Sequence, residues 1–242
     1  MASLHSADAA VTQFAVLDAL LAGAYESGIS VAAVRELGDF GIGCCDHLGG
    51  EVLILDGEVY ECTVGEPPDR MRDEQILPFV DACRFPAAEP VALAGGGLPE
   101  FTDRVEAELV SRNLFHAVRV DGRFASLRVR ITPRQHHPFR PLAEVTSGQI
   151  ETVLEDARGT LVGFWAPAIY QGITVAGLHV HFIADDRSVG GHVLDLTIGD
   201  AQLRMAAYAR FDLRLPADDV FLRTELTHGE DHRIVTVEGG AH

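Results

Sequence analysis

The chain has 242 residues, 36 acidic and 19 basic side chains and a formal net charge of −17, and every basic side chain is an arginine. The lack of lysine excludes enzymes that form a lysine Schiff base and NTPases that need the lysine of a Walker phosphate loop. The acidic balance argues against nucleic-acid binding, and the sequence has no apolar run of about 18 residues that would cross a membrane.

Hydrophobic residues make up 47% of the chain, an ordinary globular balance, and the length predicts one large domain or two small ones.

The cysteines indicate a reducing compartment. The four cysteines show no C-x-x-C spacing and two of them are adjacent: Cys44, Cys45, Cys62 and Cys83. The N-terminal stretch also lacks the basic residue and unbroken apolar run of a secretory signal. We therefore expect reduced thiols in a cytoplasmic protein.

The first third of the chain predicts two helices. Residues 9–24 place apolar side chains at helical spacing, which favours an amphipathic helix. Ser30 is a typical N-cap for a second helix at 31–37, and Gly38 would end it. The glycine-rich run at 38–50 cannot be a regular helix.

Most of the remaining elements are predicted to be strands, because apolar and β-branched residues alternate between turn signals. They are expected at residues 51–55, 57–62, 115–120, 124–131, 159–165, 177–184 and 192–198, with further alternation over 201–215. Turns at Asp56-Gly57 and Asp121-Gly122 would join the first two pairs. Helices are expected at 99–112 and from Ala217. The predicted class is α/β of the α+β kind, with two packed mixed or antiparallel β-sheet subdomains and flanking helices.

Three histidines form the most informative pattern. His179 and His181 are two residues apart on a predicted strand, so their rings project from the same face. The turn at 185–191 returns the chain, so His192 can lie beside them on the next strand. A single histidine is usually a surface or core residue without a metal, but three imidazoles from one β-hairpin can bind a divalent ion. Nitrogen ligands favour Zn²⁺ or another transition metal, and three ligands leave a position open for catalysis.

A cupin-type barrel is a second interpretation of the H-x-H pattern. Such a site usually has a glutamate shortly after the second histidine and a fourth ligand on a separate strand. This chain offers Asp185 and Asp186 instead, which are most simply turn residues. The cupin interpretation, with a metal-dependent dioxygenase or isomerase activity, therefore remains the alternative. A non-catalytic ligand-binding domain of similar architecture is a third interpretation.

The run from Gly172 to Asp195, GITVAGLHVHFIADDRSVGGHVLD, resembles the signature of the α-acetolactate decarboxylase family. Segments at 38–43 (GDFGIG), 48–60 (LGGEVLILDGEVY) and 113–122 (NLFHAVRVDG) are also similar to the family, as is the strand at 129–132. The resemblance therefore extends over nearly the whole chain. It implies one decarboxylase-like unit over 1–242, divisible into an N-terminal part of about 1–140 and a C-terminal part of about 141–242 that carries the metal ligands.

The resemblance implies roles for six residues. Three of them match the family's zinc ligands: His179, His181 and His192. The other three match its active-site arginine, Arg130, and its active-site glutamates, Glu51 and Glu238. On their own, the last three would be ordinary surface or tail charges. Four positions depart from the family pattern and affect the expected shape of the pocket, not the metal: Cys44, Cys45, Gly49 and Thr174.

The implied reaction is metal-dependent decarboxylation of 2-acetolactate to acetoin and CO2. A chain without lysine cannot store the electrons of the broken bond in an imine, so a metal is the natural sink. We expect the metal to chelate the ketone and hydroxyl oxygens and stabilise an enediolate. Arg130 would orient the carboxylate, and Glu51 or Glu238 would protonate the carbon. The native metal stays open, and the resemblance implies a homodimer with no nucleic-acid or membrane partner.

Overall fold

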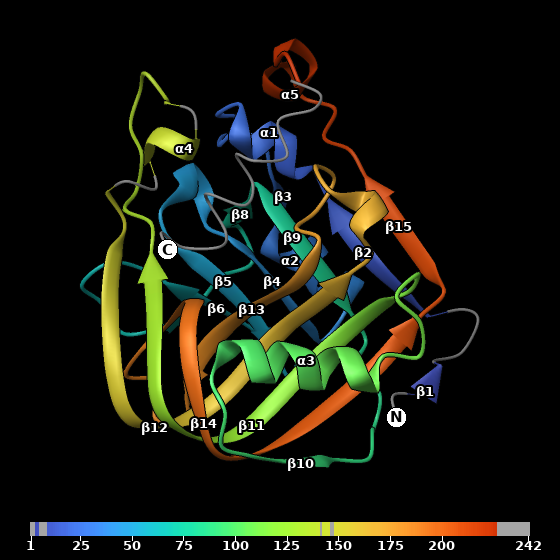
Figure 1. Ribbon diagram of the computed structural model, residues 1–242. Coiled ribbons are helices and arrows are strands. Elements are labelled where there is room, and N and C mark those ends of the chain that lie inside the picture. Colours follow the sequence, from blue (N-terminus) through green and yellow to red (C-terminus); the bar gives the residue numbers. More distant parts are fainter. Residues whose placement is uncertain (1–2, 5–8, 141, 146–147, 227–242) are drawn as a thin grey trace.

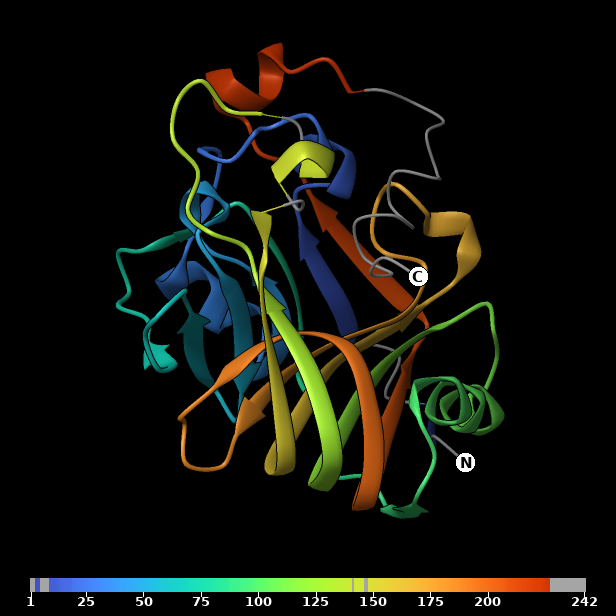
Figure 2. The ribbon, with the colours of Figure 1, turned by 60° about the vertical axis from the view of Figure 1, so that its left-hand side comes forward.

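The computed structural model describes residues 3–4, 9–140, 142–145 and 148–226, which form two large β-sheets with short helices (Figure 1). Figure 2 shows the blue and teal strands of one sheet beside the green, yellow and orange strands of the other. The predicted class, two packed sheets of mixed or antiparallel strands with flanking helices, is confirmed.

The seven-stranded sheet carries most of the N-terminal strands. In spatial order it contains β15 (Arg210–Arg214), β2 (Ala10–Phe14), β9 (Phe79–Cys83), β4 (Phe40–Cys44), β5 (Glu51–Leu55), β6 (Glu58–Cys62) and β7 (Asp69–Arg70). β15 and β2 are parallel, whereas the other neighbours are antiparallel. A separate ribbon pairs β3 (Ile29–Ser30) with β8 (Ile76–Leu77).

The six-stranded sheet carries the metal-site hairpin. Its strands are β1 (Ser3–Leu4), β10 (Val91–Ala94), β11 (Phe115–Ile131), β12 (Ile150–Ala166), β13 (Gly177–Ala184) and β14 (Gly190–Tyr208). β14 pairs with β11 along most of its length and with β13 near its start, while β12 pairs with both β11 and β13. The four long strands therefore close into a ring of pairings, and the beginning of β14 lies between β11 and β13.

The helices are short and lie outside the sheets. They are α1 (Leu17–Leu21), α2 (Val31–Leu37), α3 (Leu98–Glu108), α4 (Leu142–Val145) and α5 (Asp219–Arg223), with 3-10 turns at Asp46–Leu48 and Ala168–Tyr170. α2 begins as predicted, because the Ser30 hydroxyl accepts a hydrogen bond from the Ala33 amide at 3.3 Å. α2 packs on the outer face of the seven-stranded sheet and α3 packs on the six-stranded sheet, whereas α1 contributes Leu17 and Leu20 to the same apolar cluster as α2.

An apolar core joins the inner faces of the two sheets. Ile42 and Leu53 from the seven-stranded sheet pack in one cluster with Val162 and Ile183 from the six-stranded sheet, and none is more than 1% exposed. Burying each such side chain contributes roughly 1.5–3 kcal/mol. This core holds β5 against β13 and β14, which brings Glu51 to the histidine hairpin.

Two predicted elements are wrong. Residues 9–24 are not one helix: Ala10–Phe14 is a strand between β15 and β9, and Ala15 has a φ of +66°, so only Leu17–Leu21 is helical. Asp121-Gly122 is not a turn, because β11 runs through it without a break. A Cβ on Gly122 would lie 2.5 Å from Ala201, so this glycine permits close approach of β14 rather than chain reversal.

The two sheets exchange strands across the division that we expect near residue 140. β15 comes from the C-terminal part and pairs with β2, while β1, β10 and β11 come from the N-terminal part and join the six-stranded sheet. The division itself remains a prediction. Within the described residues, no helix is long and apolar enough to cross a bilayer.

Candidate metal centre

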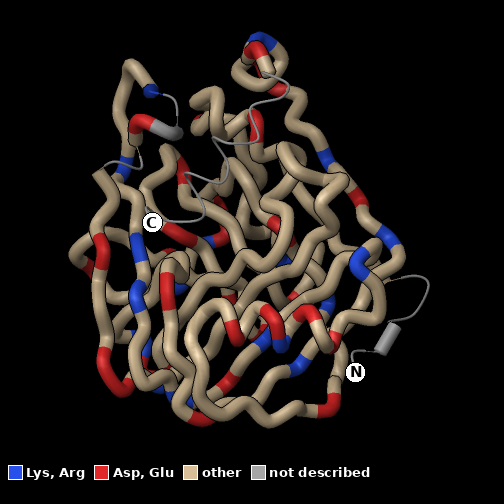
Figure 3. Tube along the Cα trace, in the orientation of Figure 1, with Lys and Arg blue, Asp and Glu red and all other residues tan. Residues whose placement is uncertain are grey.

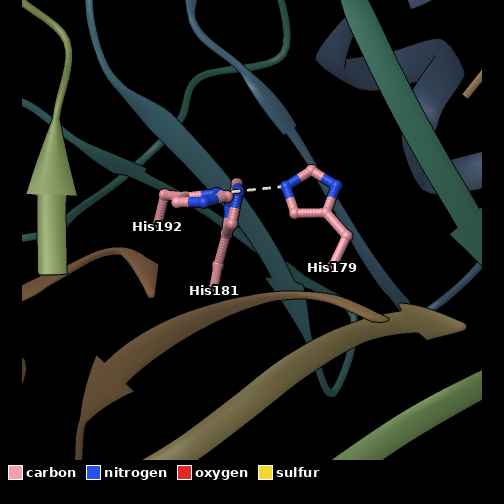
Figure 4. Close-up of side chains that lie close together, drawn as sticks. All are labelled: His179, His181 and His192. Atoms are coloured by element: carbon pink, nitrogen blue, oxygen red, sulfur yellow. Dashed lines mark hydrogen bonds between the residues drawn. The ribbon is translucent and has the colours of Figure 1, made fainter. Parts of the chain in front are cut away.

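The three predicted histidines come together at the β13–β14 hairpin. One nitrogen from each ring lies within 4.8 Å of the others, and no other described group of three such side chains could hold a metal ion. His179 Nε2 lies 3.1 Å from His192 Nδ1, and Figure 4 shows the three rings facing one another. His181 and His192 are buried and His179 is half-buried.

Strand register explains this convergence. His181 pairs with His192 across β13 and β14, and His192 pairs with Arg130 across β14 and β11. Directly paired residues point to the same face of a sheet, so these three side chains form one row. His179 joins them from two residues earlier on β13. Gly191 allows β14 to bend into this position: its φ is +153°, and a Cβ there would lie 2.6 Å from the Arg130 carbonyl oxygen.

The tautomers and charges of the rings suit metal binding. His181 Nδ1 donates a hydrogen bond to the Val52 carbonyl oxygen at 3.0 Å, which directs Nε2 toward the cluster. Burial and the nearby Arg130 guanidinium lower the pKa of His179 to about 3, so its imidazole is neutral at ordinary pH. Neutral imidazole is the form that ligates a metal, and a set of three nitrogen donors fits Zn²⁺.

Glu51 and Arg130 both lie at this centre. Glu51 begins β5, and its Oε2 is 3.7 Å from His181 Nε2. Arg130 is only 4% exposed, so it is not the ordinary exposed strand arginine that its position alone would predict. Both line a small cavity of about 40 Å³ together with His179, His181 and apolar side chains from α1, the seven-stranded sheet and the neighbouring loops. The cavity therefore combines imidazole, carboxylate and guanidinium groups in apolar surroundings.

The other predicted positions differ in their placement. Glu238 lies outside the described residues. Cys44 lines the cavity, whereas the Cys45 thiol points to the Glu51 carbonyl oxygen at 3.7 Å. Thr174 donates a hydrogen bond to Asp81, and a side chain at Gly49 would meet Arg134. Of the four departures from the family pattern, only Cys44 therefore changes the lining directly.

Two contributors to the centre were missed by reasoning from the sequence. The Val52 carbonyl holds His181, but a backbone oxygen has no signature in a sequence. Phe79 lines the cavity from β9, a strand that the pattern did not predict. The short apolar run over 79–83 was the available signal, but the polar Asp81 interrupts it.

A larger open groove of about 740 Å³ lies elsewhere and shares no residue with the histidine centre. Its two arginines already have acidic partners. Arg119 binds Asp56 at 2.6 Å and Asp121 at 2.9 Å, and Arg204 binds Asp121 at 2.8 Å. This network ties the six-stranded sheet to the turn after β5. We therefore assign it to holding the sheets together and place the chemistry at the histidines.

Comparison with known proteins agrees with the geometry. The sequence profile of a family described as alpha-acetolactate decarboxylase matches residues 11–228. The alpha-acetolactate decarboxylase of Methanosarcina mazei is 38% identical over 97% of this chain and 82% of its own length. That of Raoultella terrigena is 34% identical over 93% of this chain and 87% of its own length.

A solved structure gives the same result. The crystal structure of alpha-acetolactate decarboxylase from Bacillus subtilis strain 168 matches with a TM-score of 0.93 at 31% identity, covering 95% of this chain and 99% of that chain. Profile, sequence and fold therefore agree over nearly the full length. The chain belongs to the alpha-acetolactate decarboxylase family, a family of carboxy-lyases.

Proposed function

We propose that this protein decarboxylates 2-acetolactate to acetoin and CO2 at the His179–His181–His192 centre. The observation that carries the proposal is the convergence of three imidazoles, Glu51 and Arg130 on one cavity in a chain of this family. Family membership also favours this activity over a cupin-like dioxygenase or isomerase and over a non-catalytic binding domain.

A zinc ion is the metal that we propose for the three histidines. The support is chemical: neutral imidazoles, a buried setting and three ligands fit a catalytic zinc site better than a structural one. When bound, Zn²⁺ would supply a Lewis acid that polarises the ketone oxygen of the substrate. The chain holds the ligands in place through the hairpin register and the hydrogen bond from His181 to Val52.

Arg130 is proposed to bind and orient the substrate. Its guanidinium is planar and always charged, so it can bind a carboxylate through two parallel hydrogen bonds. The register next to His192 keeps this charge at the edge of the metal centre. Orientation matters because the bond to CO2 breaks fastest when it lies perpendicular to the plane of the neighbouring carbonyl. The apolar side chains that line the cavity also limit access of water to the reacting carbon.

Glu51 is proposed to deliver the proton. Loss of CO2 leaves the electron pair in an enediolate, and acetoin forms when the former carboxyl-bearing carbon gains a proton. Glu51 lies 3.7 Å from a ligand nitrogen and lines the cavity, so a substrate held at the metal comes within its reach. Glu238 is a second proposed proton donor that rests on the family resemblance alone.

Mixed charge on the surface supports a small-molecule substrate. Arginines and acidic residues are interspersed along the described strands in the view of Figure 3. A basic patch for nucleic acid would need arginines gathered together. We also propose a cytoplasmic homodimer, supported by the four buried cysteines without a disulfide and by the family resemblance. Analytical ultracentrifugation tests the dimer.

Acetoin formation tests the proposed activity directly. The purified protein is incubated with racemic 2-acetolactate, and acetoin is measured colorimetrically with and without a chelator. We expect acetoin from the untreated protein, its loss after chelation and its return on addition of zinc. A chelated protein that keeps full activity contradicts the metal-dependent mechanism, and oxygen consumption without acetoin would favour the cupin-like alternative.

A further inference from the structure

A buried pair of polar side chains lies next to the residues that line the metal cavity. Gln13 on β2 and Asp81 on β9 are direct partners across neighbouring strands, which lie side by side in Figure 1. Gln13 is fully buried and Asp81 is 4% exposed. Side chains of such partners start about 5 Å apart at their Cβ atoms and point to the same face. Two polar side chains are therefore neighbours inside the core.

The hydrogen bonds of this pair leave two buried acceptor oxygens without a donor. Gln13 Nε2 donates to the carbonyl oxygens of Ala15 and Ile173, both at 2.8 Å, which fixes the orientation of the amide. Asp81 Oδ2 accepts from the Thr174 hydroxyl at 3.2 Å. Gln13 Oε1 and Asp81 Oδ1 are both buried without a hydrogen-bond partner. A carboxylate and an amide oxygen cannot satisfy each other, because neither carries a proton.

One proton resolves the conflict. A protonated carboxyl at Asp81 has an O–H that can donate to Gln13 Oε1, while its other oxygen still accepts from Thr174. Leaving both buried acceptors unsatisfied would instead cost the desolvation of each oxygen without a compensating hydrogen bond. Burial supports the neutral form, since it raises the pKa of Asp81 to about 7, and the Thr174 hydrogen bond opposes this only in part.

In the part of the chain that the structure describes, no charged group on the surrounding elements stabilises a carboxylate at Asp81. β2, β4 and the loop before β13 contribute the uncharged partners Gln13, Ile42 and Thr174. On β9 itself the nearby titratable group is Cys83, and burial raises the pKa of its thiol to about 12. Both side chains are therefore neutral at mildly acidic pH.

The pair is connected to the cavity wall on three sides. Phe79 lines the cavity two residues before Asp81 on the same face of β9, and Ile42 lines it as the β4 partner of Asp81. Val175 lines it directly after Thr174. Gln13 binds Ile173, and Asp81 binds Thr174. These two hydrogen bonds attach the loop before His179 to the seven-stranded sheet.

We propose that Asp81 is a positioning residue that works as a neutral carboxylic acid, donating its proton to Gln13 and holding the 171–176 loop so that Val175 and His179 keep their places at the cavity. The kinetic part rests on the proposed decarboxylase function. The protonation state does not, so the two can fail separately.

Substitutions at Asp81 separate the neutral acid from a carboxylate. Asp81→Asn supplies an N–H for Gln13 and an oxygen for Thr174, so kcat/KM should stay within about threefold of the natural protein. Asp81→Val removes both interactions, and misplacement of the wall should lower kcat/KM by about 10- to 100-fold with zinc content unchanged. Thr174→Val provides the same test, with a smaller loss, should Asp81→Val fail to fold.

Unfolding as a function of pH and infrared spectroscopy report the proton itself. A carboxyl whose pKa is raised by folding stabilises the native state fully below its unfolded pKa of about 3.9, and this stabilisation is lost as pH rises toward the folded value. The folded-to-unfolded ratio of Asp81→Asn relative to the natural protein should therefore rise about tenfold per pH unit between about 4 and 7. At pH 6 the natural zinc-loaded protein should show the carbonyl stretch of a protonated carboxyl that Asp81→Asn lacks.

Three results would overturn the proposal. An Asn variant as impaired as the Val variant would mean that a carboxylate is required. Full activity in both Asp81→Val and Thr174→Val would remove the positioning role. A natural protein without the carboxyl band and without the pH-dependent difference in stability would show that Asp81 is ionised. A protein that shows the band but makes no acetoin would contradict the decarboxylase function alone.

Discussion

Gly191→Ala should damage the metal centre without touching a ligand. A Cβ at this position would lie 2.6 Å from the Arg130 carbonyl oxygen, about 0.8 Å short of the 3.4 Å at which ordinary van der Waals contact begins. The obstacle is backbone on β11, so β14 must move away from β11 by a distance of that order. The movement occurs between Arg130 and His192, which are register partners at the site.

The expected loss follows from this displacement. Misplacing a catalytic group by about 1 Å can cost about 100-fold in rate. We expect kcat/KM for acetoin formation to fall by about 10- to 100-fold and zinc affinity to weaken, because His192 moves relative to His179 and His181. The φ of +153° adds about 1–3 kcal/mol of backbone strain in any residue with a side chain. Steady-state kinetics, zinc content and thermal unfolding measure the three effects.

Gly65→Ala is the matched control. Gly65 also has a positive φ, +82°, but nothing lies within 4 Å of a Cβ there. This variant carries backbone strain of about 1–2 kcal/mol without the clash, so its Tm should fall by roughly 2–4 °C for each kcal/mol while its activity is unchanged. If Gly191→Ala keeps the activity and zinc affinity of Gly65→Ala, the close approach of β14 to β11 does not define the centre.

Three further variants test individual groups at the site. Glu51→Gln keeps the shape of the side chain but removes its exchangeable acid proton, so kcat should fall by about 10²- to 10⁴-fold with zinc still bound; activity within threefold of the natural enzyme would exclude Glu51 as the proton donor. Arg130→Lys keeps the charge but loses the planar fork, so KM for acetolactate should rise while the zinc content stays constant; an unchanged KM would refute carboxylate binding by Arg130. Zinc should raise the Tm of the natural protein with increasing concentration, since a ligand that binds only the folded chain stabilises it, and His181→Ala should abolish the shift.

The metal-site hairpin could be predicted because its information is local. The H-x-H spacing places two rings on one face of a strand, and the turn between Ala184 and Gly190 returns the chain, so that His192 comes only eleven residues after His181. The structure confirms that His179, His181 and His192 converge. Their use as metal ligands remains a proposal.

Strand pairing between distant parts of the sequence explains the two wrongly predicted elements. Residues 10–14 have apolar spacing that suits a helix, but they lie between β15 and β9, which are distant in sequence. Asp121-Gly122 has the composition of a turn, yet two long strands flank it, and the Asp121 carboxylate is held by Arg119 and Arg204. A single sequence does not show these partners, so the local signal gave the wrong element.

The non-histidine residues required more than residue type. Nothing local distinguishes Arg130 or Glu51 from surface charges, and only the family resemblance selected them. The structure buries both beside the histidines, through the register with His192 and the packing of β5 on β13. Neither the sequence pattern nor the family resemblance predicted the Asp81–Gln13 pair. Its two buried oxygens without a donor depend on the pairing of strands β2 and β9, which only the structure shows.

Zinc titration of the metal-free protein tests the central claim most directly. The chain is stripped with a chelator, zinc is added in steps, and bound zinc and the rate of acetoin formation from 2-acetolactate are measured on the same samples. We predict that activity rises in proportion to bound zinc and stops rising at one ion per chain, and that His179→Ala neither binds the ion nor forms acetoin. Acetoin formation that does not depend on bound zinc, or that persists in His179→Ala, would contradict a metal-dependent decarboxylase centred on these histidines.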